Sequence, residues 1–241
     1  MKYEEKAYDE LLAWQREIRK KRGFLRRISK SVQNKFNDLL PEKFHDIMTE
    51  AVKGMIETVL TGSKIFFRKP FSKAYTLEEK EKLIKEQLEK YRKTAAVEGA
   101  GTGAGGLMLG FVDFPLLLSI KTKFLYDVAR IHQYDVNEYE ERLFLLFVFQ
   151  LAFSSDEKRV ETLTIIENWE EKKKELVNLD WRSFQQEYRD YIDFVKMLQL
   201  LPGIGAAIGA YANYKLLDQL GKTAIYAYRI RYFSNLKSIK N

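Results

Sequence analysis

The fold class is decided by residues 44–60, which read FHDIMTEAVKGMIETVL. Apolar side chains recur in this stretch at intervals of three and four residues, so a helix with 3.6 residues per turn would place them on one face. The stretch therefore predicts a helix over 42–61 with one buried face. Its apolar set comprises Phe44, Ile47, Met48, Ala51, Val52, Met55, Ile56, Val59 and Leu60.

Helical spacing continues along most of the chain, and no segment shows the alternation of period two that is typical of a half-buried strand. We therefore predict an all-α fold: a single domain over residues 1–241, built as a bundle of about nine or ten helices. The expected helices cover residues 3–22, 24–39, 42–61, 77–97, 103–111, 114–133, 138–154, 157–176, 181–199 and 203–234.

The breaks between these helices follow from glycine, proline and capping residues. Gly23, Leu40-Pro41 and the stretch 61–75, which contains a glycine and a proline, interrupt the helical pattern. Thr76 and Glu79 have the spacing of a capping box, in which each side chain binds the other residue's backbone N–H. A helix is therefore expected to begin just after Thr76.

The composition excludes several classes of protein. The 241 residues are 46% hydrophobic, which is too apolar for a disordered chain, and include no cysteine. Without cysteine there can be no disulfide, thiolate zinc site, iron–sulfur cluster or cysteine nucleophile. His45 and His132 are the only histidines and lie far apart in the sequence. We therefore expect neither a metal site nor a cofactor.

The net charge of +7 is concentrated at the two ends of the chain. Residues 16–35 contain nine cations and one acid, and residues 222–241 contain five cations and no acid, which leaves −6 for the rest. This acidic body and the lack of a recognition motif argue against nucleic acid as a partner. The uneven charge instead suggests a local docking feature.

Residues 1–40 are predicted to form a basic amphipathic helical region. Between 16 and 35 the cations alternate with Ile18, Phe24, Leu25, Ile28 and Val32, a pattern typical of a helix that lies on an anionic membrane. An ordinary core helix with a solvated basic face would give the same pattern, so both interpretations stay open. The predicted membrane-surface contacts are Arg19, Lys20, Arg22, Arg26, Arg27 and Lys30.

Two glycine-rich apolar segments, 99–110 and 201–213, place small residues four positions apart. This spacing lets two helix backbones approach closely, either in a tight internal core or in a shallow membrane insertion. The residues predicted to pack in this way are Gly99, Gly103, Gly106, Gly110, Gly205 and Gly209. A dinucleotide fingerprint is excluded because residues 89–94 before the first segment are charged and helical, and no Gly-Lys-Ser/Thr completes a phosphate loop.

Glu98 and Asp113 are the only charged residues between Ala95 and Ile120. A carboxylate in apolar surroundings needs a partner, and Arg142, Arg229 or Arg231 could provide it. One interpretation is a polar site for acid–base chemistry or ligand binding, formed by Glu98, Asp113, Arg142, Asn213 and Arg229. The alternative is a buried structural ion pair, or a helix cap at Asp113.

The chain resembles the EcsC family of bacterial proteins. The resemblance rests on the run from Glu98 to Ser155, EGAGTGAGGLMLGFVDFP onward, and on LPGIGAAIGAYAN at 201–213, and it extends over nearly the whole chain. It implies a component encoded beside the subunits of an ABC transporter, a system linked to secretion and intramembrane proteolysis. It implies no catalytic residues.

The resemblance and the charge pattern together lead to one functional expectation. We expect a non-enzymatic accessory protein on the cytoplasmic face of the membrane, with the anionic membrane surface and ABC transporter subunits as partners. The N-terminal MKYEEKAYDELLAW contains no apolar core of a secretory signal, which agrees with a cytoplasmic location. The alternative is an enzyme, or a small-ligand or lipid-binding protein, that uses a polar pocket around Glu98 and Asp113.

Overall fold

A computed structural model of the chain describes residues 2–20, 42–62, 73–103, 114–154, 156–178 and 206–240. Within these ranges the chain forms eight α-helices and no β-sheet, as the all-α prediction requires. The predicted helices 24–39 and 181–199, and nearly all of 103–111, lie outside the described residues. The helices are α1 (Lys2–Lys20), α3 (Glu42–Thr61), α4 (Leu77–Gly103), α6 (Phe114–Ile131), α7 (Tyr139–Phe153), α8 (Asp156–Glu167), α9 (Trp169–Val177) and α12 (Ala206–Lys240).

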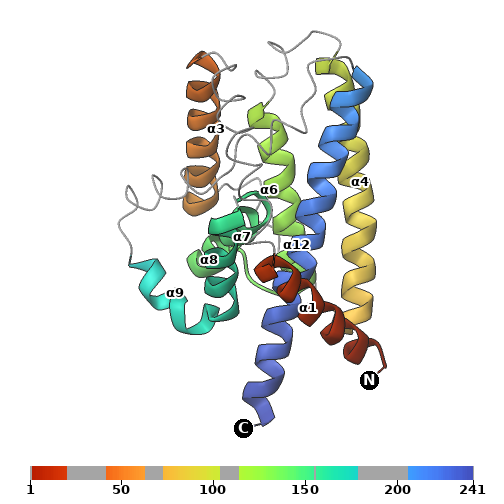
Figure 1. Ribbon diagram of the computed structural model, residues 1–241, viewed down its shortest axis with the longest axis vertical. Coiled ribbons are helices and arrows are strands. Elements are labelled where there is room, and N and C mark those ends of the chain that lie inside the picture. Colours follow the sequence, from red (N-terminus) through yellow and green to blue (C-terminus); the bar gives the residue numbers. More distant parts are fainter. Residues whose placement is uncertain are drawn as a thin grey trace.

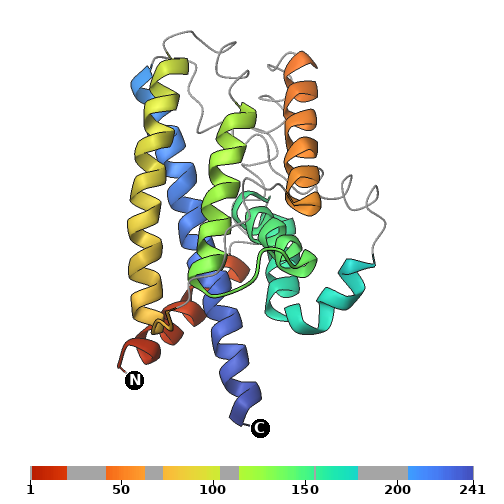
Figure 2. The ribbon, with the colours of Figure 1, turned by 180° about the vertical axis from the view of Figure 1, so that it is seen from behind.

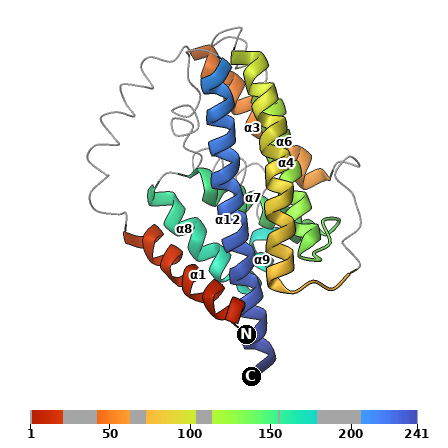
Figure 3. The same ribbon diagram turned by 90° about the vertical axis from the view of Figure 1, so that its right-hand side faces the viewer.

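The long helices α4 and α12 run antiparallel, side by side, and make the most extensive contact between any two described elements (Figure 1). Helix α6 lies beside this pair, and α3 lies on the far side of α6 (Figure 2). Helix α1 crosses α12 near its C-terminal half and also contacts α8 (Figure 3). Helix α12 is therefore central to the bundle, whereas α3 and α4 lie at its opposite edges (Figures 1 and 2).

Helix α7 is the most deeply buried element of the described chain. Its sequence, YEERLFLLFVFQLAF, is apolar all round after the first turn, and every residue from Glu141 to Phe153 is buried. A helix without a polar face can be stable only inside a protein or a membrane. Here Phe144 packs edge-on against Trp169 at 5.0 Å and against Tyr228 at 5.3 Å, which joins α7 to α9 and α12.

Local sequence signals fix several helix ends. The predicted capping box is confirmed: the Thr76 backbone N–H donates to Glu79 Oε2 at 2.9 Å, and the Glu79 N–H donates to Thr76 Oγ1 at 3.2 Å. Helix α3 ends at Thr61, and Gly62 follows with φ of 75°, a left-handed conformation that glycine adopts without strain. Both boundaries of the 61–76 break therefore come from residues visible in the sequence.

The prediction of one helix over 157–176 is wrong, because the chain bends at Asn168 between α8 and α9. The bend turns Trp169 inward, where it is 2% exposed and packs on Phe144 and Phe147. Burial of this aromatic side chain compensates for the interrupted helix.

For residues 16–20, the packing of α1 decides between a membrane-surface helix and a core helix with a solvated basic face. Ile18 lies on the face that α1 buries against the core, together with Ala7, Leu11 and Trp14. Arg19, on the exposed side, pairs with Glu167 of α8 at 2.6 Å. This part of the segment is a core helix with a basic outer face, so Ile18 is not available to enter a membrane.

Candidate functional site

A charged groove of about 460 Å³ runs between α1, α4 and α12 and contains Arg229, one of the predicted site residues. The Arg229 guanidinium binds both carboxylate oxygens of Glu81, with Nε–Oε1 and Nη2–Oε2 distances of 2.6 and 2.7 Å. Its Nη1 donates to Glu10 Oε2 at 2.9 Å and to the Ala7 carbonyl at 3.2 Å. One side chain of α12 thus joins three helices.

The Arg229–Glu81 pair is almost fully removed from water. The Glu81 side chain is 1% exposed and that of Arg229 is 6% exposed. Burial alone would lower the pKa of Arg229, but the hydrogen bonds and charges of Glu81 and Glu10 outweigh it, so the pKa is raised. Tyr3 donates to Glu81 Oε2 at 2.8 Å, and burial together with this carboxylate raises the pKa of Tyr3 to about 12.

A second arginine closes the other end of the same groove. Arg92 of α4 pairs with Glu89 on its own helix and with Asp218 of α12. Each of the four carboxylates that line the groove, two at each end, is therefore bound to an arginine. Among these lining residues no carboxylate is left unpaired for proton transfer. The arginine–carboxylate pairs of the groove instead hold α1, α4 and α12 together.

The pairings across α4 and α12 fix the register of the two helices. Glu81 faces Arg229 and Arg92 faces Asp218, so each step up α4 matches one step down α12. Both helices rise about 1.5 Å per residue. This register places Glu98 level with Ala212, the neighbour of Asn213, about 25 Å along α12 from Arg229.

The register also brings the two glycine-rich segments to the same end of the helix pair. Gly99 and Gly103 lie in the last turns of α4, level with the first turns of α12, which contain Gly209. Gly106, Gly110 and Gly205 lie outside the described residues, and close packing of the glycines stays a prediction. The close approach that the structure does describe is at Gly221, which the sequence did not single out. There, an added Cβ would lie 2.5 Å from Leu88 Cδ2.

Arg142 stabilises a different part of the fold. From the first turn of α7, its Nε donates to the Leu60 carbonyl at 3.2 Å, and its Nη1 donates to the carbonyls of Val136 and Asn137. It thereby satisfies a terminal carbonyl of α3 that has no partner within its own helix. The partners of Arg142 and Arg229 have no residue in common, and Asp113 lies outside the described residues.

A buried polar network on α7 and α12 was only partly anticipated. Arg231, named in the sequence as a possible carboxylate partner, donates to Glu141 Oε2 at 2.6 Å, and Tyr228 donates to Glu141 Oε1 at 2.6 Å. His132 stacks on Tyr228 with ring centroids 4.5 Å apart. Burial, reinforced by the charges of Lys80 and Arg231, lowers the pKa of His132 to about 3. The histidine is therefore neutral at physiological pH.

Lys121 of α6 is a buried charged residue that nothing in the sequence singles out. It is 1% exposed, and its ammonium group donates to the Leu117 carbonyl of the same helix at 3.4 Å. Burial lowers its pKa to about 7. The surrounding sequence, SIKTKF, contains two lysines two positions apart, and nothing local distinguishes the buried Lys121 from the exposed Lys123.

Two further properties of the described residues bear on function. None of their helices combines the length and the apolar character that a membrane crossing requires. They also contain no cluster of three or more side chains suited to bind a metal ion. Of the six predicted membrane contacts, Arg19 and Lys20 are described and exposed at the end of α1, whereas Arg22, Arg26, Arg27 and Lys30 lie outside the described residues.

The fold and the ion pairs between α4 and α12 define a helical-bundle protein built on one long pair of antiparallel helices. The EcsC protein family model matches residues 5–233, and the chain belongs to this family. It is 52% identical over 222 residues to Protein EcsC of Bacillus subtilis (strain 168), covering 92% of this chain and 93% of that protein. It is 31% identical over 153 residues to the uncharacterized protein YdbA of the same organism, covering 61% and 56%. No solved structure matches the chain.

Proposed function

We propose that this EcsC-family protein is a non-enzymatic accessory protein that docks on the anionic cytoplasmic face of the membrane, beside an ABC transporter. The observation that carries the proposal is the run from Lys20 to Lys35, which contains seven cations and no acid. Interleaved apolar residues give the same run the means to insert shallowly. The transporter as a partner follows from the family resemblance alone.

Two of the cations at the C-terminal end are neutralised inside the protein. Arg229 and Arg231 supply two of the five cations in residues 222–241, and both are buried against glutamates. A charge that is already paired in the core contributes little to attraction at a surface. These two pairings leave less charge for docking at the C-terminal end, and we therefore assign docking to the N-terminal run.

The expected size of the membrane contribution can be estimated from the charge. Each Lys or Arg close to an anionic surface contributes about 1 kcal/mol at physiological ionic strength. If four cations act at half strength, they contribute about 2 kcal/mol, or roughly a thirtyfold change in partitioning. This effect is large enough to measure with purified protein.

The test is flotation of the full chain with vesicles of phosphatidylcholine, with and without phosphatidylglycerol. We expect flotation with the anionic vesicles and little with the neutral ones. Replacement of Arg22, Arg26, Arg27 and Lys30 by glutamine should reduce binding to anionic vesicles roughly thirtyfold. A protein that ignores both kinds of vesicle would refute the proposal.

A matched control separates local charge from net charge. The four lysines Lys82, Lys85, Lys90 and Lys93 are all exposed on α4. Their replacement by glutamine changes the net charge by the same amount as the N-terminal variant. We expect this control to float like the unmodified chain. Equal loss in both variants would show that binding depends on overall charge and not on the N-terminal run.

A ligand-binding role around Glu98 and Asp113 is the second candidate, and one observation favours it. The α4–α12 register brings Glu98 to within one residue of the level of Asn213, although the two are 115 positions apart in the sequence. Functional carboxylates are often retained at a cost in stability. A Glu98→Gln variant should therefore raise Tm if this residue serves binding, and lower Tm by several degrees if it forms a structural ion pair.

A further inference from the structure

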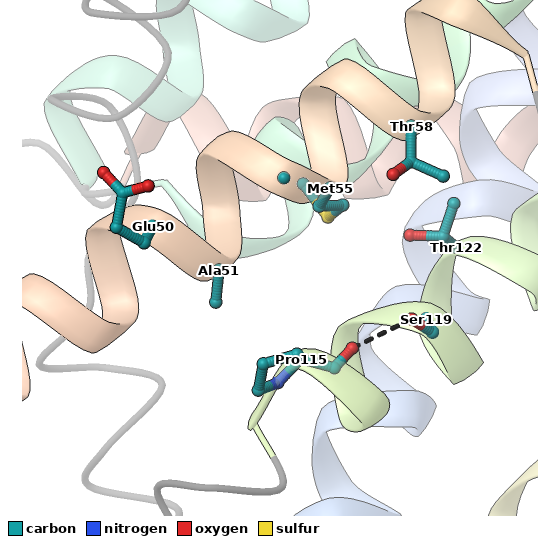
Figure 4. A pocket seen from close by; sticks show the side chains of 8 residues that line it. Glu50, Ala51, Met55, Thr58, Pro115, Ser119 and Thr122 are labelled. Carbon is teal, nitrogen blue, oxygen red and sulfur yellow. Dashed lines mark hydrogen bonds between the residues drawn. The ribbon is translucent and has the colours of Figure 1, made fainter.

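A second cavity lies between α3 and α6, away from the charged groove (Figure 4). Its volume is about 490 Å³, within the range of about 300–1,000 Å³ that is usual for small-molecule sites. Most of its wall is apolar or small, with three hydroxyl groups and a single charged residue at one end. The lining residues are Glu50, Ala51, Gly54, Met55, Thr58, Pro115, Ser119 and Thr122.

The described side-chain hydrogen bonds between α3 and its neighbours lie at the C-terminal end of α3, beyond the cavity. The Tyr126 hydroxyl donates to the Val59 carbonyl at 3.3 Å, and Arg142 Nε donates to the Leu60 carbonyl at 3.2 Å. Further up α3, the residues that face α6 are small. At Gly54 an added Cβ would meet no atom within 4 Å, so the space beside α3 is open.

Thr122 places an unpaired hydroxyl in this space. The residue is 4% exposed, and within the described part of the chain its Oγ1 has no hydrogen-bond partner. The neighbouring Ser119 differs, because its hydroxyl donates to the Pro115 carbonyl at 2.9 Å (Figure 4). Buried polar groups in native proteins nearly always have a partner, so the Thr122 hydroxyl is available to bind a polar group that enters the cavity.

We propose that the α3–α6 cavity binds an uncharged single-chain lipid, such as a monoacylglycerol, whose ester or hydroxyl oxygen hydrogen-bonds to Thr122. The apolar wall formed by Ala51, Met55 and Pro115 fits an alkyl chain. Glu50 is the only charged lining residue, and it is exposed and pairs with Lys53 at 3.7 Å. No cation lines the cavity, so a fatty-acid carboxylate would be buried there without a partner, which is costly. This inference is independent of membrane docking, because the cavity contains none of the N-terminal cations.

The test uses the fluorescent apolar probe N-phenyl-1-naphthylamine with the full-length protein. We expect saturable fluorescence enhancement, displaced by monolauroylglycerol at concentrations below its critical micelle concentration. Laurate should displace the probe at least tenfold less effectively, because no cation lines the cavity to pair with its carboxylate. No saturable enhancement would overturn the proposal, and equal displacement by laurate would overturn the assignment of an uncharged lipid.

Three variants locate the binding and test the role of the hydroxyl. Gly54→Leu extends a side chain into the cavity from a position where an added Cβ would meet no atom within 4 Å, and should abolish both probe binding and displacement while the protein stays folded. Thr122→Val keeps the shape and removes the hydroxyl, and should weaken monolauroylglycerol about three- to tenfold. Thr223→Val is the matched control, since this buried threonine of α12 already bonds the Gln219 carbonyl. It should change neither.

The outcomes of these variants separate a real site from nonspecific binding. Probe binding that survives Gly54→Leu would overturn the proposal, because the probe would then be bound elsewhere. Equal losses in Thr122→Val and Thr223→Val would overturn the role of the Thr122 hydroxyl. A melting curve of each variant checks that the fold is retained, and Thr122→Val should melt no lower than the unmodified chain because it removes an unsatisfied group.

Discussion

The helix pairs α4–α12 and α3–α6 border spaces of similar volume that are lined in different ways. The groove of about 460 Å³ between α1, α4 and α12 is charged, and Arg92 and Arg229 pair with its carboxylates at both ends. The cavity of about 490 Å³ between α3 and α6 is mostly apolar, and the described side-chain hydrogen bonds between α3 and its neighbours lie near the C-terminal end of α3. Ion pairs join the helices across the first space, whereas none joins the described residues that line the second.

Two helical glycines express this difference. Gly221 of α12 lies where a methyl group would meet Leu88 at 2.5 Å, and Gly54 of α3 lies where a methyl group would meet nothing. Glycine lowers helix stability in both positions. At Gly221 the cost is compensated by close packing, and at Gly54 no packing gain compensates for it. A site kept open for a ligand would explain the second case.

The largest expected effect comes from breaking the buried Arg229–Glu81 ion pair between α12 and α4. Glu81→Ala leaves the Arg229 guanidinium buried without its bidentate partner, and should lower the free energy of unfolding by about 3–5 kcal/mol. Glu86→Ala, an exposed change on the same helix, should cost less than about 1 kcal/mol. Urea denaturation of both variants checks the comparison. Similar losses in the two variants would show that this ion pair does not stabilise the fold.

Acid should lower the stability of the fold through His132, which stacks on Tyr228 of α12. The pKa of this histidine is about 3 in the folded protein and 6.5 in the unfolded chain, so below pH 6.5 the unfolded state binds a proton that the folded state excludes. Stability is fully present above pH 6.5 and falls as pH decreases toward 3. By pH 4 the loss from this group is about 3 kcal/mol.

A His132→Phe variant isolates this contribution, since it retains an aromatic ring beside Tyr228 and cannot be protonated. The free energy of unfolding, measured by denaturation at pH 7 and pH 4, should fall less in this variant than in the unmodified chain. Equal falls in the two proteins would contradict the assignment of the acid sensitivity to His132.

A smaller effect is expected at Gly221 of α12, where Leu88 of α4 leaves no room for an added methyl group. Gly221→Ala gains helix propensity but forces Leu88, which is 5% exposed, to move. Overpacking of this kind costs about 1–3 kcal/mol, and the gain in propensity is up to about 1 kcal/mol, so we expect a net loss of about 1 kcal/mol. Thermal denaturation should show a lower Tm. An unchanged or higher Tm would mean that Leu88 repacks freely.

The smallest expected effect is a gain in stability at Gly54 of α3, beside the α3–α6 cavity. Gly54→Ala adds a methyl group to open space and removes backbone entropy from the unfolded chain, so it should stabilise the protein by about 0.5–1 kcal/mol. The same thermal measurement should show a higher Tm. A loss of stability here would indicate that the space beside Gly54 is filled in solution.

Much of the architecture was predictable because helix signals are local. The apolar spacing of 44–60 gave the range of α3 to the residue, and Thr76 with Glu79 gave the start of α4. The bend at Asn168 was not predictable from spacing, because it depends on a contact between Trp169 and α7, which lies earlier in the chain.

The site was predictable only in part, because its pairings join distant residues. The sequence suggested Arg142, Arg229 or Arg231 as a partner of Glu98 or Asp113, whereas Arg229 and Arg231 pair with two other glutamates. Their actual partners, Glu81 and Glu141, lie on charged helix turns that resemble solvated surface. Thr122 has no sequence signal at all, since its importance depends on a hydrogen bond that is missing. Such features require the packed structure.

The claim that local positive charge docks the protein on the membrane is tested most directly by the salt dependence of vesicle binding. Partitioning of the full chain onto vesicles containing phosphatidylglycerol should fall steeply as salt rises, because salt screens attraction between exposed charges. The dependence should be much flatter when Arg22, Arg26, Arg27 and Lys30 are glutamine. Binding that does not change with salt, or an equally steep decline in this variant, would contradict the claim.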